Sequence, residues 1–539
     1  MSASAKYPHP LMSQGLAIPV IDLFAGPGGL GEGFASLFDR RGRRMFRIAL
    51  SVEMDRTAHR TLRLRSFFRS FDPDDVPADY YRYLQGDPEL PAQEALFDRH
   101  PRAGDAAKDE AWQATLGETS AAYVSRRVNE ALVSLPAGRP WIMIGGPPCQ
   151  AYSLVGRSRM IGEVGHRAFY EDKRHTLYQE YLRLIKGHAP AMFIMENVKG
   201  LLSSRLNDTL IFGQILKDLR RPKPGLDYRL TALSSSEDGL FSGCETTDQA
   251  DPEAFLLRAE NHGVPQARHR LIIVGVRSDY AASGASMPNA ISRCGQRTCR
   301  QAIADLPPLR SSISRATDSD TKWMDLLRSS LHQRWFKQLA SADQSDVAAR
   351  ISRAVGGIRI PRSRTGARFI RCEGVPDLAP EWFIDTRLGG VCNHESRSHI
   401  ASDLWRYLFV SSFGAERGSS PKIKDFPRAL LPDHANIDEA VNSRMFNDRF
   451  RVQIWDRPST TVTSHISKDG HYFIHPDPTQ ARSLTVREAA RLQTFPDNYF
   501  FEGPRTEQYH QVGNAVPPLL ARKVAESVAR FLDPSFKAK

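Results

Sequence analysis

The chain has 539 residues, more than one hydrophobic core ordinarily supports, so two or three domains are expected. Its apolar content of 41% and charged content of 25% are typical of a soluble globular protein, and no apolar run is long enough to cross a bilayer, which excludes an integral membrane protein. The net charge is +12 at pH 7. Solubility alone could explain this excess of basic residues, but it favours a polyanionic partner such as nucleic acid.

Residues 1–10 contain no apolar stretch of the kind that a signal peptide needs, so a cytoplasmic protein with no membrane partner is expected. The cysteines are scattered through a large chain, which indicates a reducing compartment rather than a disulfide framework. They are Cys149, Cys244, Cys294, Cys299, Cys372 and Cys392. The spacing of Cys294 and Cys299, taken with a distant Cys392-x-His394 pair, fits zinc poorly, so no metal site is expected.

The first predicted strand is Ile18–Phe24, and a glycine-rich segment, Ala25–Gly33, follows it directly. Glycines after a strand let the backbone turn tightly and approach a ligand, and the helix that follows presents its N-terminus to that ligand. The literal pattern Gly26-x-Gly28-x-x-Gly31 suits a nicotinamide or flavin dinucleotide as well as a smaller adenosine cofactor. Phe24 is placed to stack on an adenine.

The second predicted strand, Arg47–Glu53, ends in an acidic residue about 20 residues beyond the glycines, the spacing at which a carboxylate holds ribose hydroxyls. Asp87, in Gln85-Gly86-Asp87, is predicted to end a third strand-like unit. Further strands are predicted at 141–144, 192–195 and 271–276, and a helix at 121–135. This alternation predicts a parallel sheet with helices on both faces.

Ligands of such sheets bind at the carboxyl ends of the strands, so Glu53, Asp87, Cys149 and Glu196 should converge on one edge. Cys149 follows an apolar strand on the Gly/Pro turn Gly145–Pro148, where a thiol is placed to act as a nucleophile rather than to fill a core.

Glu196 directly follows another predicted strand and is a candidate acid or base, although a helix-capping acid would have the same position. Arg268 and Arg270 are two residues apart in an extended segment, so both are expected to face the site. Two surface arginines at the start of a strand would give the same pattern.

The segment from Arg277 to Asp456 is irregular and rich in arginine, glycine and proline. It is interpreted either as solvated loop or as a phosphate- and guanine-binding surface, which planar guanidinium groups suit. Near the end, Thr485–Glu488 is a capping-box pattern that opens a helix through Leu492, and an amphipathic helix is predicted over Leu519–Leu532.

Taken together and in this order, these motifs resemble those of the DNA cytosine-5 methyltransferases. The resemblance spans most of the chain, and it makes the nicotinamide interpretation unnecessary. The matching segments are Asp22–Gly29, Gly146–Gln150, Glu196–Val198, Gln266–Arg270, Arg457–Thr463 and Gly513–Pro518.

The resemblance implies an α/β fold: a Rossmann-like S-adenosylmethionine-dependent methyltransferase sheet with helices on both faces, plus a smaller, irregular, mostly β target-recognition domain. It implies a catalytic domain over residues 1–285 and a target-recognition domain over 286–475 that is long enough to contain an insertion. A hinge over 476–505 and a C-terminal segment over 506–539, which returns to the catalytic domain, complete the expected organisation.

The resemblance also implies S-adenosyl-L-methionine as the cofactor. Its expected contacts are Phe24, Gly26, Gly28, Gly29, Glu53, Met54, Asp87, Pro147 and Asn514. Cys149 is expected to add to carbon 6 of a cytosine and Glu196 to bind its amine and ring nitrogen 3. Arg270 is expected to hold the carbonyl oxygen of the base, and Arg268 to orient Glu196.

The partner implied is duplex DNA, bound by a monomer with the target base turned out of the helix. The expected DNA contacts are Gln150, Ser153, Arg157 and Arg457, and residues 152–174 match the family's mobile loop. A restriction-modification or related defence role, with a cognate endonuclease or defence proteins and association with the nucleoid, follows from the family. A tRNA cytosine-5 methyltransferase and a catalytically inactive DNA-binding regulator are the alternatives.

Overall fold

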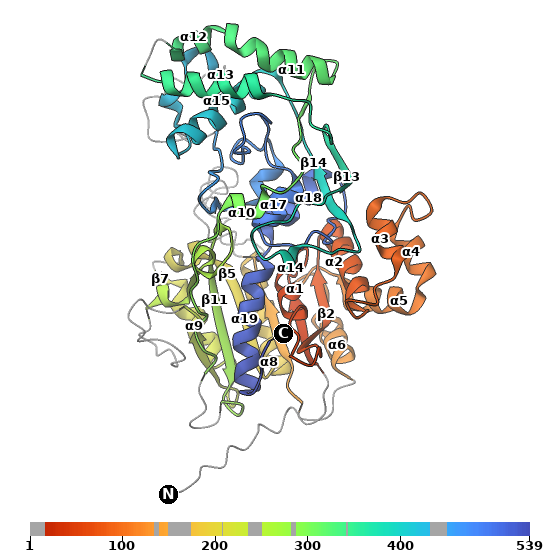
Figure 1. The fold of residues 1–539 in the computed structure, drawn as a ribbon. Helices are drawn as coiled ribbons and strands as arrows, with labels where there is room; N and C mark the ends of the chain where they lie inside the picture. Colours follow the sequence, from red (N-terminus) through yellow and green to blue (C-terminus); the bar gives the residue numbers. More distant parts are fainter. Residues whose placement is uncertain are drawn as a thin grey trace, which may run out of the picture.

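The computed structural model describes residues 17–133, 139–148, 174–206, 209–234, 251–281, 287–340, 343–431 and 450–538. Its centre is a sheet with the strand order β3-β2-β1-β4-β5-β11-β8, to which β9 adds by pairing with β11 (Figure 1). The bounds are β1 Ile18–Leu23, β2 Phe46–Glu53, β3 Ala111–Gln113, β4 Ile142–Gly145, β5 Met192–Val198, β8 Tyr228–Ala232, β9 Leu256–Arg258 and β11 His269–Arg277.

The strands from β3 to β5 are parallel, whereas β11 runs antiparallel to β5, β8 and β9. The sheet is therefore mixed, not wholly parallel as the alternation of elements predicted. The direction of β11 matters for the site because its first residues, not its last, lie at the edge where the parallel strands end.

Helices cover both faces of this sheet, which confirms the predicted Rossmann-like α/β class. Alternate residues of β1 divide between two cores: Val20 packs with α1 (Gly29–Ala35) and α19 (Pro518–Leu532), and Ile21 packs on the opposite face. The helices of that opposite face are α6 Ala121–Leu132, α8 Arg174–His188 and α9 Ile211–Arg220. The predicted C-terminal helix over 519–532 is confirmed by α19, which buries Leu520, Val524 and Val528.

A helical insertion separates β2 from β3. It contains α2 Arg56–Arg69, α3 Ala78–Gln85, α4 Gln93–Arg99 and α5 Pro101–Glu110. The prediction that Asp87 ends a strand is therefore wrong: Gly86 adopts a left-handed conformation (φ 84°) that terminates α3, and Asp87 follows it. The third strand is β3, which is only three residues long and too short for a period-2 pattern to be seen.

The region between β11 and residue 475 contains a helical lobe, at the top of Figure 1, and several short strands. The helices are α10 Cys299–Ile303, α11 Asp320–Ser329, α12 Arg334–Ala340, α13 Ser345–Gly357, α14 Pro380–Phe383 and α15 Ala401–Arg417. The strands are β12 Ser312–Ile313, β13 Gly366–Arg371, β14 Gly390–Glu395, β15 Ser398–His399 and β16 Ser459–Thr460. In the described residues of this region helix therefore exceeds strand, so the region is not mostly β as expected.

The reason is that the arginine-rich segment contains an amphipathic helix. In α13 the apolar residues Val347, Ile351 and Val355 recur every four positions and are buried against α15, while Arg350 pairs with Glu416 on the outside. Neither interpretation of the segment, solvated loop or flat cationic surface, predicted this core.

The C-terminal part contains α17 (Val486–Leu492) and α18 (Arg505–Asn514), which precede α19, the helix that packs with α1 on the central sheet. The capping box at the start of α17 is confirmed, because the Thr485 side chain accepts from Glu488 N and the Glu488 carboxylate accepts from Thr485 N. Residues 480–502, which lie in the segment predicted to be a hinge, are buried throughout. The boundaries at 285, 475 and 505 remain predictions.

The other strands described are short: β6 Arg205–Leu206, β7 Thr209–Leu210 and β10 Gln266–Ala267. Among the described residues, no helix combines the length and apolar character needed to cross a membrane.

Candidate active site

The carboxyl ends of β4 and β5 and the start of β11 bring an acid and an arginine together. In the β5–β11 ladder Arg270 is opposite Val198, and Ile272 is opposite Glu196. The Nε atom of Arg270 lies 2.6 Å from Oε1 of Glu196, and each side chain is only 13% exposed. Burial lowers the pKa of Arg270, and the neighbouring carboxylate opposes that effect. A charged pair is thus held at the sheet edge with little access to water.

The turn that leads to Cys149 is tied to the same place. The Asn197 amide donates to Pro147 O at 3.1 Å, and its own oxygen accepts from Val198 N at 2.8 Å. Gly146 is needed here, because a Cβ at this position would lie 2.7 Å from Oε2 of Glu196. The chain therefore leaves β4 directly against the Glu196 carboxylate.

Cys149, the predicted nucleophile, lies outside the described residues, as do the predicted DNA contacts Gln150, Ser153 and Arg157. The last described residue of this turn is Pro148, one position before Cys149. Asn197 belongs to a matching segment but was not predicted as a site residue. Its position directly after Glu196 on an extended strand was the only signal for its contact with Pro147.

Arg268 has different partners from those expected. Its side chain is fully buried and donates to Val462 O at 2.7 Å and Gly513 O at 3.2 Å. The guanidinium that contacts Glu196 belongs to Arg270, so the expectation that Arg268 orients Glu196 is corrected. The physical reason is that Arg268 lies between β10 and β11, where β10 pairs with β16 and brings the C-terminal segments within reach. Burial lowers the pKa of Arg268 well below its usual value.

The glycine loop after β1 has the backbone shape of a ligand-binding turn. Phe24, Gly26 and Gly28 all have positive φ, at 56°, 57° and 96°. For a phenylalanine this conformation is strained, and such strain concentrates at functional sites. Gly26 N donates to Oε2 of Glu53 at 2.7 Å, which joins the loop to the acid at the end of β2. Burial raises the pKa of Glu53.

The loop is also packed against the C-terminal part of the chain. A Cβ on Gly29 would lie 2.1 Å from Val516 O, so only glycine allows this approach. Asn514 is exposed and lies two residues before this contact, at the end of α18. The predicted closing motif and the predicted cofactor loop are therefore in contact.

Beneath the loop lies a buried acid, Asp22. It is 1% exposed, and a Cβ on Gly31 would lie 2.8 Å from its Oδ2 atom. Burial raises the pKa of Asp22 to about 8, and the positive charge of Arg69 partly offsets this.

Two exposed residues lie at the ends of β2 and β3. Met54 is 60% exposed although it is a large apolar residue, and the Gln113 amide donates to its carbonyl at 3.4 Å. Gln113 is in register with Glu53 and was missed because β3 is so short. Asp87 is not at this edge: its carboxylate pairs with Arg82 at 2.8 Å within the helical insertion.

Arg457 is exposed, and its carbonyl accepts from Cys299 N at 2.9 Å, just before β16. Its role in DNA contact remains a prediction. Among the described residues, no cluster of three or more histidine, cysteine or acidic side chains has the arrangement to hold a metal ion.

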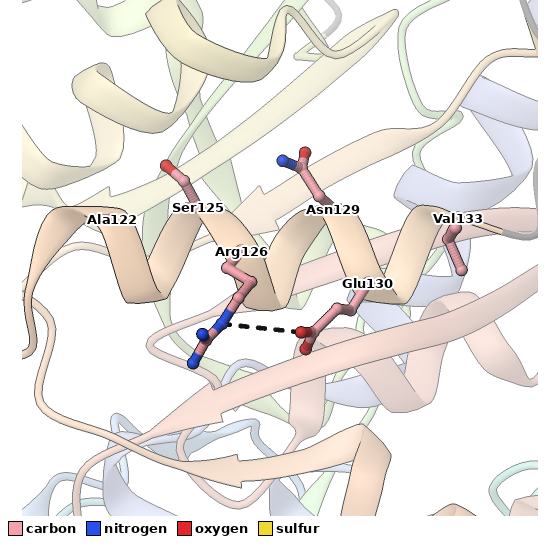
Figure 2. Close-up of a pocket in the computed structure, with 6 residues that line it drawn as sticks. All are labelled: Ala122, Ser125, Arg126, Asn129, Glu130 and Val133. Carbon is pink, nitrogen blue, oxygen red and sulfur yellow. Dashed lines mark ion pairs between the residues drawn. The ribbon is translucent and has the colours of Figure 1, made fainter.

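The hollow of about 440 Å³ on the outer face of α6 is separate from this site (Figure 2). It is lined by Ala122, Ser125, Arg126, Asn129, Glu130 and Val133. Figure 2 shows these residues on a single helix, with Arg126 Nε 3.7 Å from Glu130 Oε1. No predicted site residue lines it, and we assign it no part in the chemistry.

Comparison with known proteins agrees with the order of the motifs. Residues 124–530 match the family model described as C-5 cytosine-specific DNA methylase. The chain is 32% identical over 525 residues to the type II methyltransferase M.Bpa9945I of Bacillus paralicheniformis, an alignment that covers 94% of this chain and 98% of the relative. It is 25% identical over 537 residues to the type II methyltransferase M.AgeI of Thalassovita gelatinovora, with coverage of 94% and 98%. It is also 27% identical over 438 residues to the DNA (cytosine-5-)-methyltransferase M.ApeKI of Aeropyrum pernix, with coverage of 73% and 81%.

Proposed function

The chain belongs to the C-5 cytosine-specific DNA methylase family and is a DNA cytosine-5 methyltransferase, and on that premise we propose its donor, its nucleophile and its substrate. The donor is S-adenosylmethionine, and the acceptor is carbon 5 of a cytosine turned out of duplex DNA. The observation that carries this proposal is the buried Glu196–Arg270 pair beside the turn that leads to Cys149.

The residues around the glycine loop suit the proposed cofactor. Loop glycines with positive φ allow close approach of a ligand to the backbone, the Glu53 carboxylate is of the kind that accepts from ribose hydroxyls, and exposed Met54 offers an apolar face for a base. Pro147 and Asn514 are the further contacts proposed. When bound, S-adenosylmethionine supplies an electrophilic methyl group.

Cys149 is proposed as the nucleophile. Carbon 5 of cytosine is unreactive until a thiolate adds to carbon 6. The new S–C6 bond pushes an electron pair toward carbon 5, which becomes enamine-like and accepts the methyl group. The broken S–CH3 bond of the donor leaves S-adenosylhomocysteine as the second product. A base then takes the proton from carbon 5, ring nitrogen 3 returns its proton to Glu196, and cleavage of the S–C6 bond releases methylcytosine and the thiolate.

Glu196 is proposed to bind the cytosine amine and to protonate ring nitrogen 3 as charge develops there. That role needs a proton on or shared with Glu196 in the complex. The Arg270 contact fixes the orientation of the carboxyl group. Because Nη1 of Arg270 donates to His269 O at 2.8 Å, Nη2 is the group proposed to bind the carbonyl oxygen of the base. Arg268 contributes by holding the Val462 and Gly513 segments in place.

The substrate is proposed to be duplex DNA, bound by a monomer, with Gln150, Ser153, Arg157 and Arg457 among the contacts. Turning a base out of the helix costs a few kcal/mol, which protein–DNA contacts must offset. Because relatives over nearly the full length are named as type II methyltransferases, a restriction-modification role with a cognate endonuclease is proposed. We expect the protein in the cytoplasm, associated with the nucleoid through DNA.

The test is transfer of a tritiated methyl group from S-adenosylmethionine to duplex DNA and, separately, to tRNA. Cys149→Ser should abolish transfer, whereas the matched variant Cys294→Ser, which changes an exposed cysteine, should leave it unchanged. DNA carrying 5-fluorocytosine should trap the wild-type protein through a peptide that contains position 149.

Label on tRNA alone would show that tRNA, not DNA, is the substrate. No label on either nucleic acid would favour a DNA-binding regulator. Equal transfer by Cys149→Ser would remove Cys149 as the nucleophile. Bisulfite sequencing of DNA from expressing cells returns the methylated motif directly.

A further inference from the structure

His269, the residue between the two arginines at the start of β11, forms an ion pair of its own. His269 and Arg270 are consecutive residues of the strand, so their side chains point to opposite faces. The Nε2 atom of His269 lies 2.8 Å from Oε1 of Glu260. Because an ionised carboxylate only accepts hydrogen bonds, Nε2 carries the proton that it shares with Glu260.

Glu260 is a buried acid with few donors around it. It lies in the single turn Ala259–His262, directly after β9, and is 9% exposed. Its second oxygen, Oε2, is buried and has no hydrogen-bond partner among the residues that the structure describes. A buried carboxylate is costly unless donors compensate it, so the bond from His269 to Oε1 should hold the ring and the turn firmly together.

The same turn also supports the main chain of the arginine segment. Ala259 N donates to Arg268 O at 2.9 Å, and His269 is in register with Arg258 on β9. The ladder between β5 and β11 begins one residue later, at Arg270. The peptide of His269 is therefore supported from the side of β9 and the turn that follows it.

The carbonyl of His269 orients the guanidinium of the site. Nη1 of Arg270 donates to His269 O at 2.8 Å, and Nε of the same group lies 2.6 Å from Oε1 of Glu196. Because a guanidinium is planar, contacts at two of its nitrogens also determine where the third, Nη2, points. A shift of the His269 peptide would tilt that plane and move Nη2.

We propose that His269 is a positioning residue for methyl transfer: through its bond to Glu260 it fixes the carbonyl that orients Arg270, and so places Nη2 and the Glu196 carboxyl group against the base. His269 itself points away from the base and acts only through Arg270. This inference rests on the proposed function, because it requires Glu196 and Arg270 to bind the target cytosine.

The test is the single-turnover rate of methyl transfer to duplex DNA by the full-length protein, measured beside the affinity for S-adenosylhomocysteine. His269→Phe keeps a planar ring but removes the donor. It should slow transfer about 10-fold, because small displacements of reacting groups have large effects on rate, and should leave the affinity unchanged. His332→Phe, which changes an exposed histidine in the helical lobe, should alter neither quantity.

Rescue and coupling separate positioning from loss of packing. His269→Gln supplies an N–H near the place of Nε2 and should transfer within about twofold of the wild-type rate. Glu260→Gln retains the acceptor and should do the same. Glu260→Ala should be as slow as His269→Phe, and the double variant should be no slower than either, because both changes remove one bond.

A wild-type rate in His269→Phe would overturn the inference, as would a His269→Gln variant that is equally slow or losses that add in the double variant. Urea midpoints show whether each variant is folded; should Glu260→Ala unfold, the His269 series alone decides. Near-normal transfer by Arg270→Met would instead overturn the proposed role of the Glu196–Arg270 pair, so the two failures are distinguishable.

Discussion

The Nε atom of Arg270 lies 2.6 Å from Oε1 of Glu196, and both side chains are almost inaccessible to water. Removal of one partner leaves a buried charge without its counterion, which costs about 3 kcal/mol or more. We predict that Arg270→Met lowers the free energy of unfolding by about that amount and slows methyl transfer at least about 100-fold.

The matched control is Arg221→Met, which breaks an exposed ion pair with Asp227. Exposed ion pairs contribute little to stability because water and salt screen them, so both stability and transfer rate should stay near wild type. Urea unfolding and single-turnover methyl transfer measure the two effects. Near-normal transfer by Arg270→Met would contradict the role given to this pair.

The hydrogen bond from Asn197 to Pro147 O fixes the turn that precedes Cys149. We predict that Asn197→Ala slows methyl transfer about 10-fold to 100-fold, because small displacements of reacting groups have large effects on rate. The affinity for S-adenosylhomocysteine should change little. Asn129→Ala, on the exposed face of α6 in Figure 2, is the control, and an equal loss of rate there would refute the prediction.

Alanine substitutions at two glycines, Gly29 and Gly213, are predicted to change stability in opposite directions. At Gly29 a methyl group would lie 2.1 Å from Val516 O, so Gly29→Ala should destabilise the protein by about 3 kcal/mol and weaken cofactor binding. At Gly213, inside α9, a methyl group would meet no described atom within 4 Å apart from its chain neighbours and the backbone of its own helix, so alanine should stabilise by about 0.5–1 kcal/mol. Urea midpoints of both variants test the pair, and equal midpoints would show that the Val516 contact does not constrain the loop.

The buried carboxyl group of Asp22 should make the stability of the folded protein depend on pH. Its pKa in the folded protein is raised to about 8 by burial, above the ordinary value of 3.8, so folding favours the protonated form. The folded state then holds a proton that the unfolded state has lost, and stability falls as pH rises from about 4 to about 8.

We therefore predict that Asp22→Asn, which cannot ionise, gains stability relative to wild type by roughly 4 kcal/mol between pH 5 and pH 9. Urea unfolding at pH 5, 7 and 9 measures the difference, with exposed Asp74→Asn as the control. A difference that is constant with pH would mean that Asp22 does not titrate in this range.

The features predicted best from the sequence are those that depend on residues close together in the chain. The first strand and the capping box at Thr485 depend on neighbours in the chain, and the structure contains both. The helix expected after Gly33 begins instead at Gly29, inside the glycine-rich segment, and ends at Ala35. The direction of β11 was not predictable, because an apolar run has the same period whether its neighbours are parallel or antiparallel. Which arginine pairs with Glu196 was not predictable either, because it depends on the direction of β11 and on the C-terminal segments that accept hydrogen bonds from Arg268.

The prediction that Asp87 ends a strand was wrong for a different reason. The sequence Gln85-Gly86-Asp87 suits the end of a strand, but Gly86 is also the residue type that ends a helix in the left-handed conformation. The helical insertion then moves the third strand to Ala111–Gln113, where three residues carry too little pattern to be recognised.

The close approach of Val516 O to Gly29 has a consequence for how the chain is made. One surface of α1 is covered by α19, which is synthesised almost five hundred residues later. Until α19 has emerged from the ribosome, the nascent chain lacks the helix that covers this apolar face of α1 and supports the glycine turn. Chaperones that shield such faces during synthesis should therefore bind the emerging N-terminal part, and ligand capture should begin only after α19 has been synthesised.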